Sequence, residues 1–145
     1  MDIRAFMAYP VRFIPSDEGG FTVVVSGVEG AISEGDTRKE AERAAIDVIA
    51  DMANFYLDEK RPIPPAPQPK ADEELVRIPL VMAIKIVLRN EMLSQNVSQR
   101  ELARRLGVSA QLLSQTLDLA RTRTSIDALD EACRALGKRL SVAVE

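Results

Sequence analysis

The sequence predicts an α+β protein, in which a small β-sheet with one helix precedes an all-α unit that ends in a β-strand. Three observations predict this arrangement. All six aromatic residues of the 145-residue chain precede residue 57, and six of its eight prolines lie between residues 62 and 79. Apolar residues alternate with a period of two between residues 9 and 25, whereas beyond residue 80 they follow a helical period. We therefore predict a sheet-and-helix module at 1–61, a linker at 62–79 and a helical domain at 80–145.

The first module begins with a predicted β-hairpin. Its strands are YPVRFI at residues 9–14 and FTVVV at residues 21–25, each with alternating apolar residues. SDEGG at residues 16–20 supplies the turn between them. The short apolar piece VEGAI at residues 28–32 predicts a third strand.

A long helix is predicted from residue 37 to residue 59. Thr37 and Glu40 have the spacing of a capping box, which satisfies backbone amides at the start of a helix. The apolar residues of this segment fall on one stripe, which we expect to cover one face of the sheet. The stripe consists of Ala41, Ala45, Val48, Ile49, Met52 and Phe55.

The segment that follows is rich in proline. PIPPAPQPKADEE, at residues 62–74, favours an extended and partly polyproline II conformation that packs poorly. A plain spacer is the simpler interpretation of it, and a PxxP binding motif is the alternative. We expect residues 62–79 to form an unpacked, proline-rich linker.

The helical domain contains two short helices joined by a tight turn. Residues 81–95 predict a first, longer helix. In SQRELARRLGVSAQLLSQTLD, at residues 98–118, Ser98 caps a helix that Gly107 ends, and Ser109 caps the next. The small Ala103 allows the two helices to cross closely. This pattern is typical of a helix-turn-helix that reads DNA, and an ordinary αα-hairpin is the alternative.

The outer face of the second short helix is polar. Glutamine pairs in bidentate fashion with adenine, and serine bonds a base edge or a phosphate. Residues 85–123 carry seven bases, Lys85 and Arg89 among them, against three acids, which predicts a patch that faces phosphates. The residues predicted to contact DNA are Ser98, Gln99, Arg100, Ser109, Ala110, Gln111, Ser114 and Gln115.

The chain ends in a predicted helix and strand. Ser125 caps the helix, Gly137 stops it, and its inner face is Ile126, Leu129, Ala132, Cys133 and Leu136. In RLSVAVE, at residues 139–145, apolar residues alternate as in a strand that lacks a partner in its own domain. Pairing with the same strand of a second copy would form a two-fold dimer. A frayed tail or an added strand within the monomer is the alternative. The dimer contacts would be Leu140, Val142 and Val144.

Composition excludes several kinds of site. The chain has no histidine and one cysteine, which excludes Ser-His and Cys-His nucleophiles, histidine acid-base catalysis and cysteine-based metal sites. The two strands of the predicted hairpin carry no carboxylate, so the sequence does not predict carboxylates that converge on divalent ions as a nuclease requires. We therefore predict no catalytic residue, no metal and no cofactor. The chain has no 18-residue apolar run and no signal-peptide pattern, so we expect a cytoplasmic protein that does not enter a membrane.

Several stretches in order along the chain resemble the HicB family, the antitoxins of HicA-HicB toxin-antitoxin pairs. They are YPVRF, EGGFTVVV, the Gly-Asp-Thr of SEGDTRKEAERAA and PIPP in the first part, then IPLVMAIKIVL, SQRELARRLGVS and ALGKRLSVAVE. SGVEGA at residues 26–31 departs from the family pattern. The resemblance implies a degenerate, inactive ribonuclease H-like first module and the HicB subclass with a C-terminal helix-turn-helix.

The resemblance also implies two partners. The first module would bind and inhibit a small, basic, mRNA-cleaving HicA toxin, and the second would repress the operon by binding double-stranded operator DNA as a dimer or a higher oligomer. Residues 1–70 carry twelve acids and eight bases, a net charge of -4 that suits a basic toxin, whereas residues 71–145 have a net charge of +1. The residues expected at the toxin are Tyr9, Asp17, Glu18, Phe21, Glu34 and Asp36.

Two other functions stay open from the residues themselves. One is a stand-alone nuclease, which a purified protein that does not cleave RNA with magnesium or manganese would exclude. A transcription regulator whose first module senses a small molecule would share every feature of the helical domain. Such a regulator would need a ligand-sized apolar pocket between the sheet and its helix.

Overall fold

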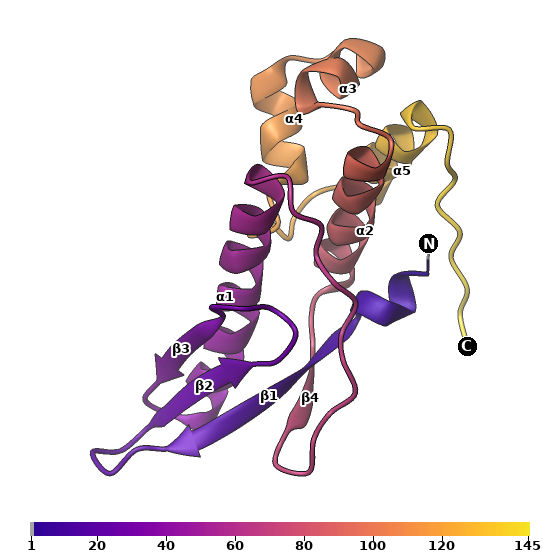
Figure 1. Cartoon of the computed structure of the whole chain (residues 1–145). Helices are drawn as coiled ribbons and strands as arrows, with labels where there is room; N and C mark the ends of the chain where they lie inside the picture. The colour runs from indigo at the N-terminus through magenta and orange to yellow at the C-terminus, as the bar shows by residue number, and fades with distance from the viewer. Residues whose placement is uncertain (1) are drawn as a thin grey trace.

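A computed structural model describes residues 2–145 and has a four-stranded antiparallel sheet at one end and a group of helices at the other (Figure 1). The predicted α+β class is confirmed. The elements are η1 (Ile3–Phe6), β1 (Ala8–Pro15), β2 (Phe21–Val25), β3 (Ile32–Gly35), α1 (Arg38–Asp58), β4 (Glu74–Arg77), α2 (Leu80–Ser94), α3 (Gln99–Leu106), α4 (Ala110–Leu117) and α5 (Ile126–Ala135).

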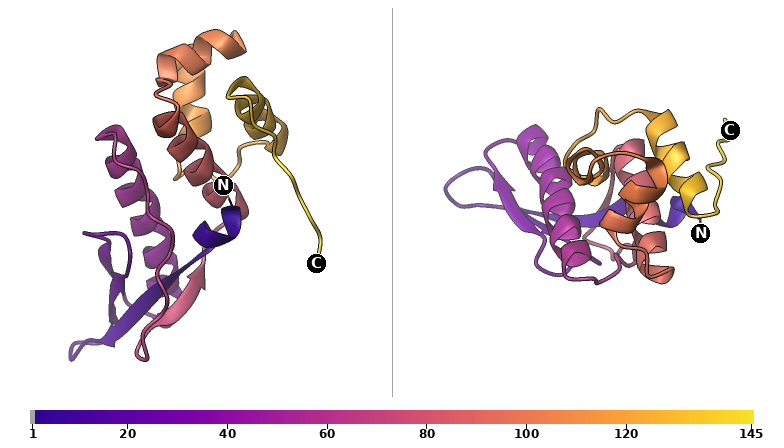
Figure 2. Two further views of the ribbon diagram at one scale, coloured as in Figure 1. Left: turned by 45° about the vertical axis from the view of Figure 1, so that its right-hand side comes forward. Right: turned by 90° about the horizontal axis from the view of Figure 1, so that it is seen from above.

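The sheet has the strand order β3-β2-β1-β4, and its centre is the predicted hairpin. In that hairpin Val11 pairs with Val25 and Phe13 with Val23. Tyr9, Val11 and Val23 have no exposed surface, because α1 packs across this face of the sheet (Figure 2). The alternate residues of the strands lie on the opposite face, which no helix covers in the described part of the chain.

The third strand begins later than predicted, at Ile32 rather than at residue 28. Val28 and Ala31 are buried, but a loop carries them inward. Gly27 and Gly30 both have positive φ, at 90° and 86°, so the chain turns on either side of Val28 instead of extending. The apolar pattern of VEGAI therefore reports burial and not a strand.

Helix α1 starts as predicted and packs through small residues. The Thr37 hydroxyl accepts a hydrogen bond from the Glu40 amide at 3.1 Å, and the Glu40 carboxylate accepts one from the Asp36 amide at 3.1 Å. Two residues expected to face the core do not: Phe55 is 53% exposed and Ile126, on α5, is 41% exposed. In α1 the inward positions near the C-terminal end are instead Ala53, Tyr56 and Leu57.

The segment at 62–79 differs from the expected unpacked linker. Residues Glu74–Arg77 form β4, which pairs antiparallel with β1. Ile63 and Ile78 are buried, and the side chain of Asn90 bonds both the amide and the carbonyl of Ile63 at 2.9 Å. The segment packs because it supplies the edge strand and two apolar residues to a core formed by distant parts of the chain. Residues 62–79 are therefore not an unpacked spacer.

Helix α2 belongs to both halves of the molecule. One of its faces enters the core beneath the sheet, together with Leu119 from beyond α4. The other face enters the core of the helical half. The residues on the first face are Met82, Ala83 and Ile86, and those on the second are Ile84, Leu88 and Met92.

A polar junction also joins the two halves. Asn54 of α1 donates to the Asp118 carboxylate at 2.9 Å, and its carbonyl oxygen accepts from Arg89 of α2 at 2.9 Å and from the Leu119 amide at 3.2 Å. Arg89 also pairs with Asp58 at 3.2 Å. These contacts hold α1 and α2 against the segment that follows α4.

The C-terminal segment is not a strand in the single chain. Residues 138–145 run away from α5 in an irregular, extended course, and no strand of the described chain lies beside them (Figures 1 and 2). Leu140 is half-buried against the helical core, whereas Val142 and Val144 are 72% and 99% exposed. A strand needs a neighbour to accept its backbone hydrogen bonds, and the monomer offers none here.

No helix among the described residues is long and apolar enough to cross a membrane.

Candidate functional site

Helices α3 and α4 form a compact unit whose ends are fixed by local hydrogen bonds. The Ser98 hydroxyl accepts from the Glu101 amide, and the Ser109 hydroxyl accepts from the Leu112 amide, both at 3.0 Å. Gly107 ends α3 with a left-handed φ of 67°, as a C-terminal glycine does. Ala103 is buried at the crossing. We refer to residues 98–117 as the α3–α4 unit.

The polar residues predicted on α4 do lie together on its outer surface. Gln111, Ser114 and Gln115 are exposed, while Leu113 and Leu117 are buried on the opposite side. The side-chain oxygen Oε1 of Gln115 accepts from the Arg121 guanidinium at 3.3 Å. Four other residues predicted for this site, Ser98, Arg100, Ser109 and Ala110, are exposed at the two helix starts, and Gln99 is half-buried.

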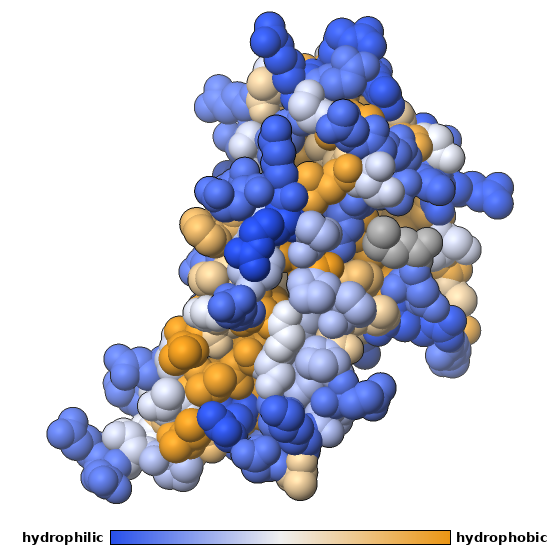
Figure 3. Space-filling model, in the orientation of Figure 1, coloured by the Kyte–Doolittle hydropathy of each residue, from blue (hydrophilic) through white to orange (hydrophobic). Residues whose placement is uncertain are grey.

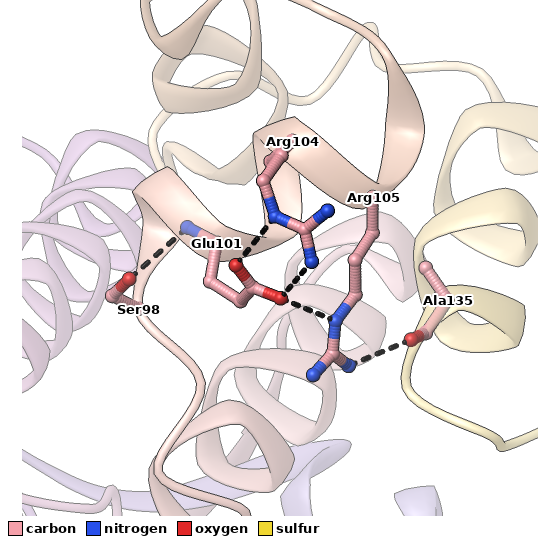
Figure 4. A network of polar contacts seen from close by, with 5 residues as sticks. All are labelled: Ser98, Glu101, Arg104, Arg105 and Ala135. Atoms are coloured by element: carbon pink, nitrogen blue, oxygen red, sulfur yellow. Dashed lines mark hydrogen bonds and ion pairs between the residues drawn. The ribbon is translucent and has the colours of Figure 1, made fainter.

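An acidic residue reduces the positive charge of α3. Glu101 accepts hydrogen bonds from Arg104 at 2.9 and 2.6 Å and from Arg105 at 3.1 Å (Figure 4). The bonds from Arg104 and then Arg105 lower the pKa of the Glu101 carboxyl to about 2. Arg105 also donates to the Ala135 carbonyl at 3.0 Å, so it fixes α3 to α5. Arg100 is exposed and takes part in no ion pair among residues 2–145.

Two of the bases counted toward the predicted phosphate patch are in the interior. Lys85 has no exposed surface, and its ammonium donates to the carbonyls of Asp118 and Arg121 and to the Thr124 hydroxyl at 2.8, 2.6 and 2.7 Å. Arg89 is bound in the junction with Asn54 and Asp58. The prediction that these two face phosphates is wrong. Helix α2 is buried on both of its long faces, so its bases point inward.

The residues predicted at the toxin divide into buried and exposed. Tyr9 has no exposed surface, and its hydroxyl donates to the Pro64 carbonyl at 3.1 Å, so it cannot touch a partner. Phe21 is half-buried against the core. The four carboxylates, Asp17, Glu18, Glu34 and Asp36, are exposed. They lie near one end of the sheet, because Phe21 at the start of β2 pairs with Gly35 at the end of β3.

The uncovered face of the sheet carries apolar residues that the sequence did not single out. Ile14 and Ile32 are exposed on it, and the half-buried Val24 pairs with Ile32 on β3 and with the exposed Arg12 on β1. Glu34 projects on this same face, because it pairs with Thr22, two residues from Val24. Apolar atoms are visible over the sheet end of the molecule, bordered by hydrophilic ones (Figure 3). The face thus has apolar residues beside one base, next to an acidic end.

A cavity of about 540 Å³ lies away from the sheet, between η1, α2, α5 and the C-terminal segment. Its walls include Ile3, Ile84, Leu136 and Leu140. A small-molecule sensor in the first module would instead need its pocket between the sheet and α1. There the facing residues, such as Val23 and Ala45, are fully buried against one another.

Comparison with known proteins identifies the class of the chain. A family model described as the HicB_like antitoxin of bacterial toxin-antitoxin systems matches residues 8–87. The chain is 35% identical over 136 residues to Antitoxin HicB of Escherichia coli strain K12, covering 94% of this chain and 98% of that protein. It is 38% identical over 136 residues to Antitoxin HicB 2 of Photorhabdus laumondii, covering 94% and 95%, and 35% identical over 140 residues to Antitoxin HicB 1 of the same organism, covering 96% and 88%. These matches are to antitoxins of bacterial toxin-antitoxin systems. The chain belongs to the HicB-like antitoxin family.

Proposed function

We propose that this antitoxin neutralises a HicA-type mRNA-cleaving toxin through its sheet and represses its own operon through the α3–α4 unit. The observation that carries the DNA half is the outer face of α4. It presents Gln111 and Gln115 to solvent one turn apart, above two buried leucines that hold the helix in place. A helix so fixed can enter a major groove, where each glutamine has the donor and acceptor that match adenine. We assign the chain no catalytic role and no cofactor.

The toxin half rests on family membership and on the uncovered face of the sheet. A small basic toxin would bury Ile14, Val24 and Ile32 and meet the carboxylates at the adjoining end. Tyr9 and Phe21 would support this surface from below instead of touching the toxin. Because an mRNA-cleaving toxin and an operator are both cytoplasmic partners, we place the antitoxin in the cytoplasm.

Co-expression of the full chain with the toxin of its operon tests the toxin half. We expect the chain to restore growth to cells that express the toxin and to co-purify with it. Asp17→Lys and Glu18→Lys together should weaken that complex and make it more sensitive to salt, since both charges lie at its edge. Lys39→Glu is the control. It also reverses the charge of an exposed residue, but it makes the antitoxin more acidic, so it should not weaken the complex. If the doubly substituted chain bound the toxin as tightly as the native chain, the toxin would not bind at this end of the sheet.

We propose a dimer as the DNA-binding form. A single α3–α4 unit makes few phosphate contacts, and two units one helical turn apart would supply the affinity that an operator requires. The dimer would form when the C-terminal segment pairs with the same segment of a second copy, through Leu140, Val142 and Val144. This pairing would cover the exposed valines and provide the missing strand neighbour. Sedimentation of the full chain measures this association.

Replacing Gln111 with alanine should weaken operator binding by about 1 to 3 kcal/mol, because a bidentate contact to adenine is lost. Binding to random duplex should be nearly unchanged, since it depends on phosphates. Fluorescence anisotropy at fixed salt measures both affinities. Gln68→Ala, at an exposed position of the proline-rich segment, is the matched control and should bind like the native chain. Equal losses on operator and random DNA would reject the base-reading role of Gln111.

A further inference from the structure

An exposed leucine lies among the polar residues of α4. Leu112 is 51% exposed, although the adjacent Leu113 is 1% exposed and belongs to the helical core. Val108, in the turn before α4, is 36% exposed. Isolated apolar residues at a surface are common. Here one lies in the turn and the other in the first turn of α4, and both are near the residues proposed to read DNA.

The helical period places Leu112 on the DNA-facing side of α4. Leu113 and Leu117 mark the inward direction, and Gln115 points almost directly away from them because successive residues are about 100° apart. Gln111 lies to one side of Gln115 and Leu112 lies about 60° to the other side. The outermost surface of α4 is therefore glutamine, glutamine and leucine. The Thr116 hydroxyl, which could have added a polar contact beside Leu112, donates to the Leu112 carbonyl at 2.9 Å.

A leucine at this place matches one chemical group in the major groove. Thymine presents a methyl group at C5 there, and apolar side chains contact it, whereas adenine, guanine and cytosine present only polar atoms or bare ring edges. Glutamine selects the adenine of an A·T pair, and the methyl of a thymine lies on the partner strand or on a neighbouring pair. We propose that Leu112 contacts the C5-methyl of an operator thymine and helps to determine sequence specificity. This inference rests on the proposed binding of DNA by α4.

Uracil substitution tests the contact, because deoxyuridine differs from thymidine only in lacking that methyl. Sites are first selected from a randomised duplex with the full chain. Each thymine of the selected site is then replaced singly by deoxyuridine, and affinities are measured at fixed salt. We expect one thymine in each half-site whose replacement weakens the native chain about four-fold, the effect of losing one buried methyl.

The Leu112→Ala variant separates this contact from other effects. It should bind the thymine duplex at least about four-fold more weakly than the native chain and show no further loss on the uracil duplex. Leu75→Ala, at an exposed position on β4, should keep the full thymine preference. Thermal unfolding of both variants checks that they fold.

The outcomes distinguish this inference from the function on which it rests. If no sequence is enriched in the selection, the proposed DNA binding itself fails. If a site is enriched but Leu112→Ala keeps the native ratio of thymine to uracil affinity, Leu112 does not contact a methyl group and this inference is overturned. A Leu112→Ala chain that loses self-association and keeps that ratio would show that Leu112 instead contacts a second copy.

Discussion

Replacing Lys85 with methionine is expected to lower the free energy of unfolding by about 2 to 4 kcal/mol, because three acceptors around a fully buried ammonium lose their donor. The Lys85 ammonium donates to two carbonyls and one hydroxyl in the segment between α4 and α5, at 2.6 to 2.8 Å. Burial lowers the pKa of Lys85 to about 8, so the group is charged at neutral pH and makes all three bonds. Methionine fills the space of the stem but donates nothing.

Urea unfolding of the two chains measures this difference. Lys138→Met is the matched control, since Lys138 is exposed and its contact with Glu91, at 3.7 Å, is long. That change should alter stability by less than about 0.5 kcal/mol. In the Lys85→Met variant, amides of residues 118–124 should also exchange with solvent faster than those of the sheet. A variant as stable as the control would mean that the three acceptors find other partners.

Capping residues, which contact the backbone only a few positions away, correctly predicted where the helices begin and end. Thr37, Ser98, Ser109 and Ser125 each accept a hydrogen bond from the amide three residues on, as their spacing indicated. The end of α3 at Gly107 was predicted in the same way, and this glycine has a left-handed φ of 67°. Helix ends depend on residues that are close together in the chain, so they can be predicted from the sequence.

Most contacts between particular residues in distant parts of the chain were not predicted. The alternation around Tyr9 showed that it faces one side of the sheet but not that α1 covers that side. Lys85 resembled a surface base because its acceptors come from a loop more than 30 residues away. The position of Leu112 was different, because the helical period already shows that adjacent leucines cannot both face one core. That signal was present in the sequence and was missed.

Residues 1–65 alone are expected to be unfolded, contrary to the expectation that the first module is independent. This fragment lacks β4, so β1 loses one of its two neighbours. It also lacks four apolar side chains that are almost fully buried in the core beneath the sheet: Ile78, Met82, Ile86 and Leu119. Burial of such side chains stabilises by about 1.5 to 3 kcal/mol each, and their sum is comparable to the whole stability of a typical domain. The fragment should therefore show no cooperative thermal transition and should not bind the toxin.

A single cut in the intact chain provides the sharper comparison, because no residue is removed. Residues 70–72 form an exposed turn before β4, where a protease site can be inserted. We expect the two pieces to remain together in gel filtration, because β4 pairs with β1 and α2 fills both cores. The nicked protein should still bind toxin and operator, and the pieces should separate only in denaturant. Two pieces that part in buffer, each folded and each binding its own partner, would show that the antitoxin consists of two independent modules after all.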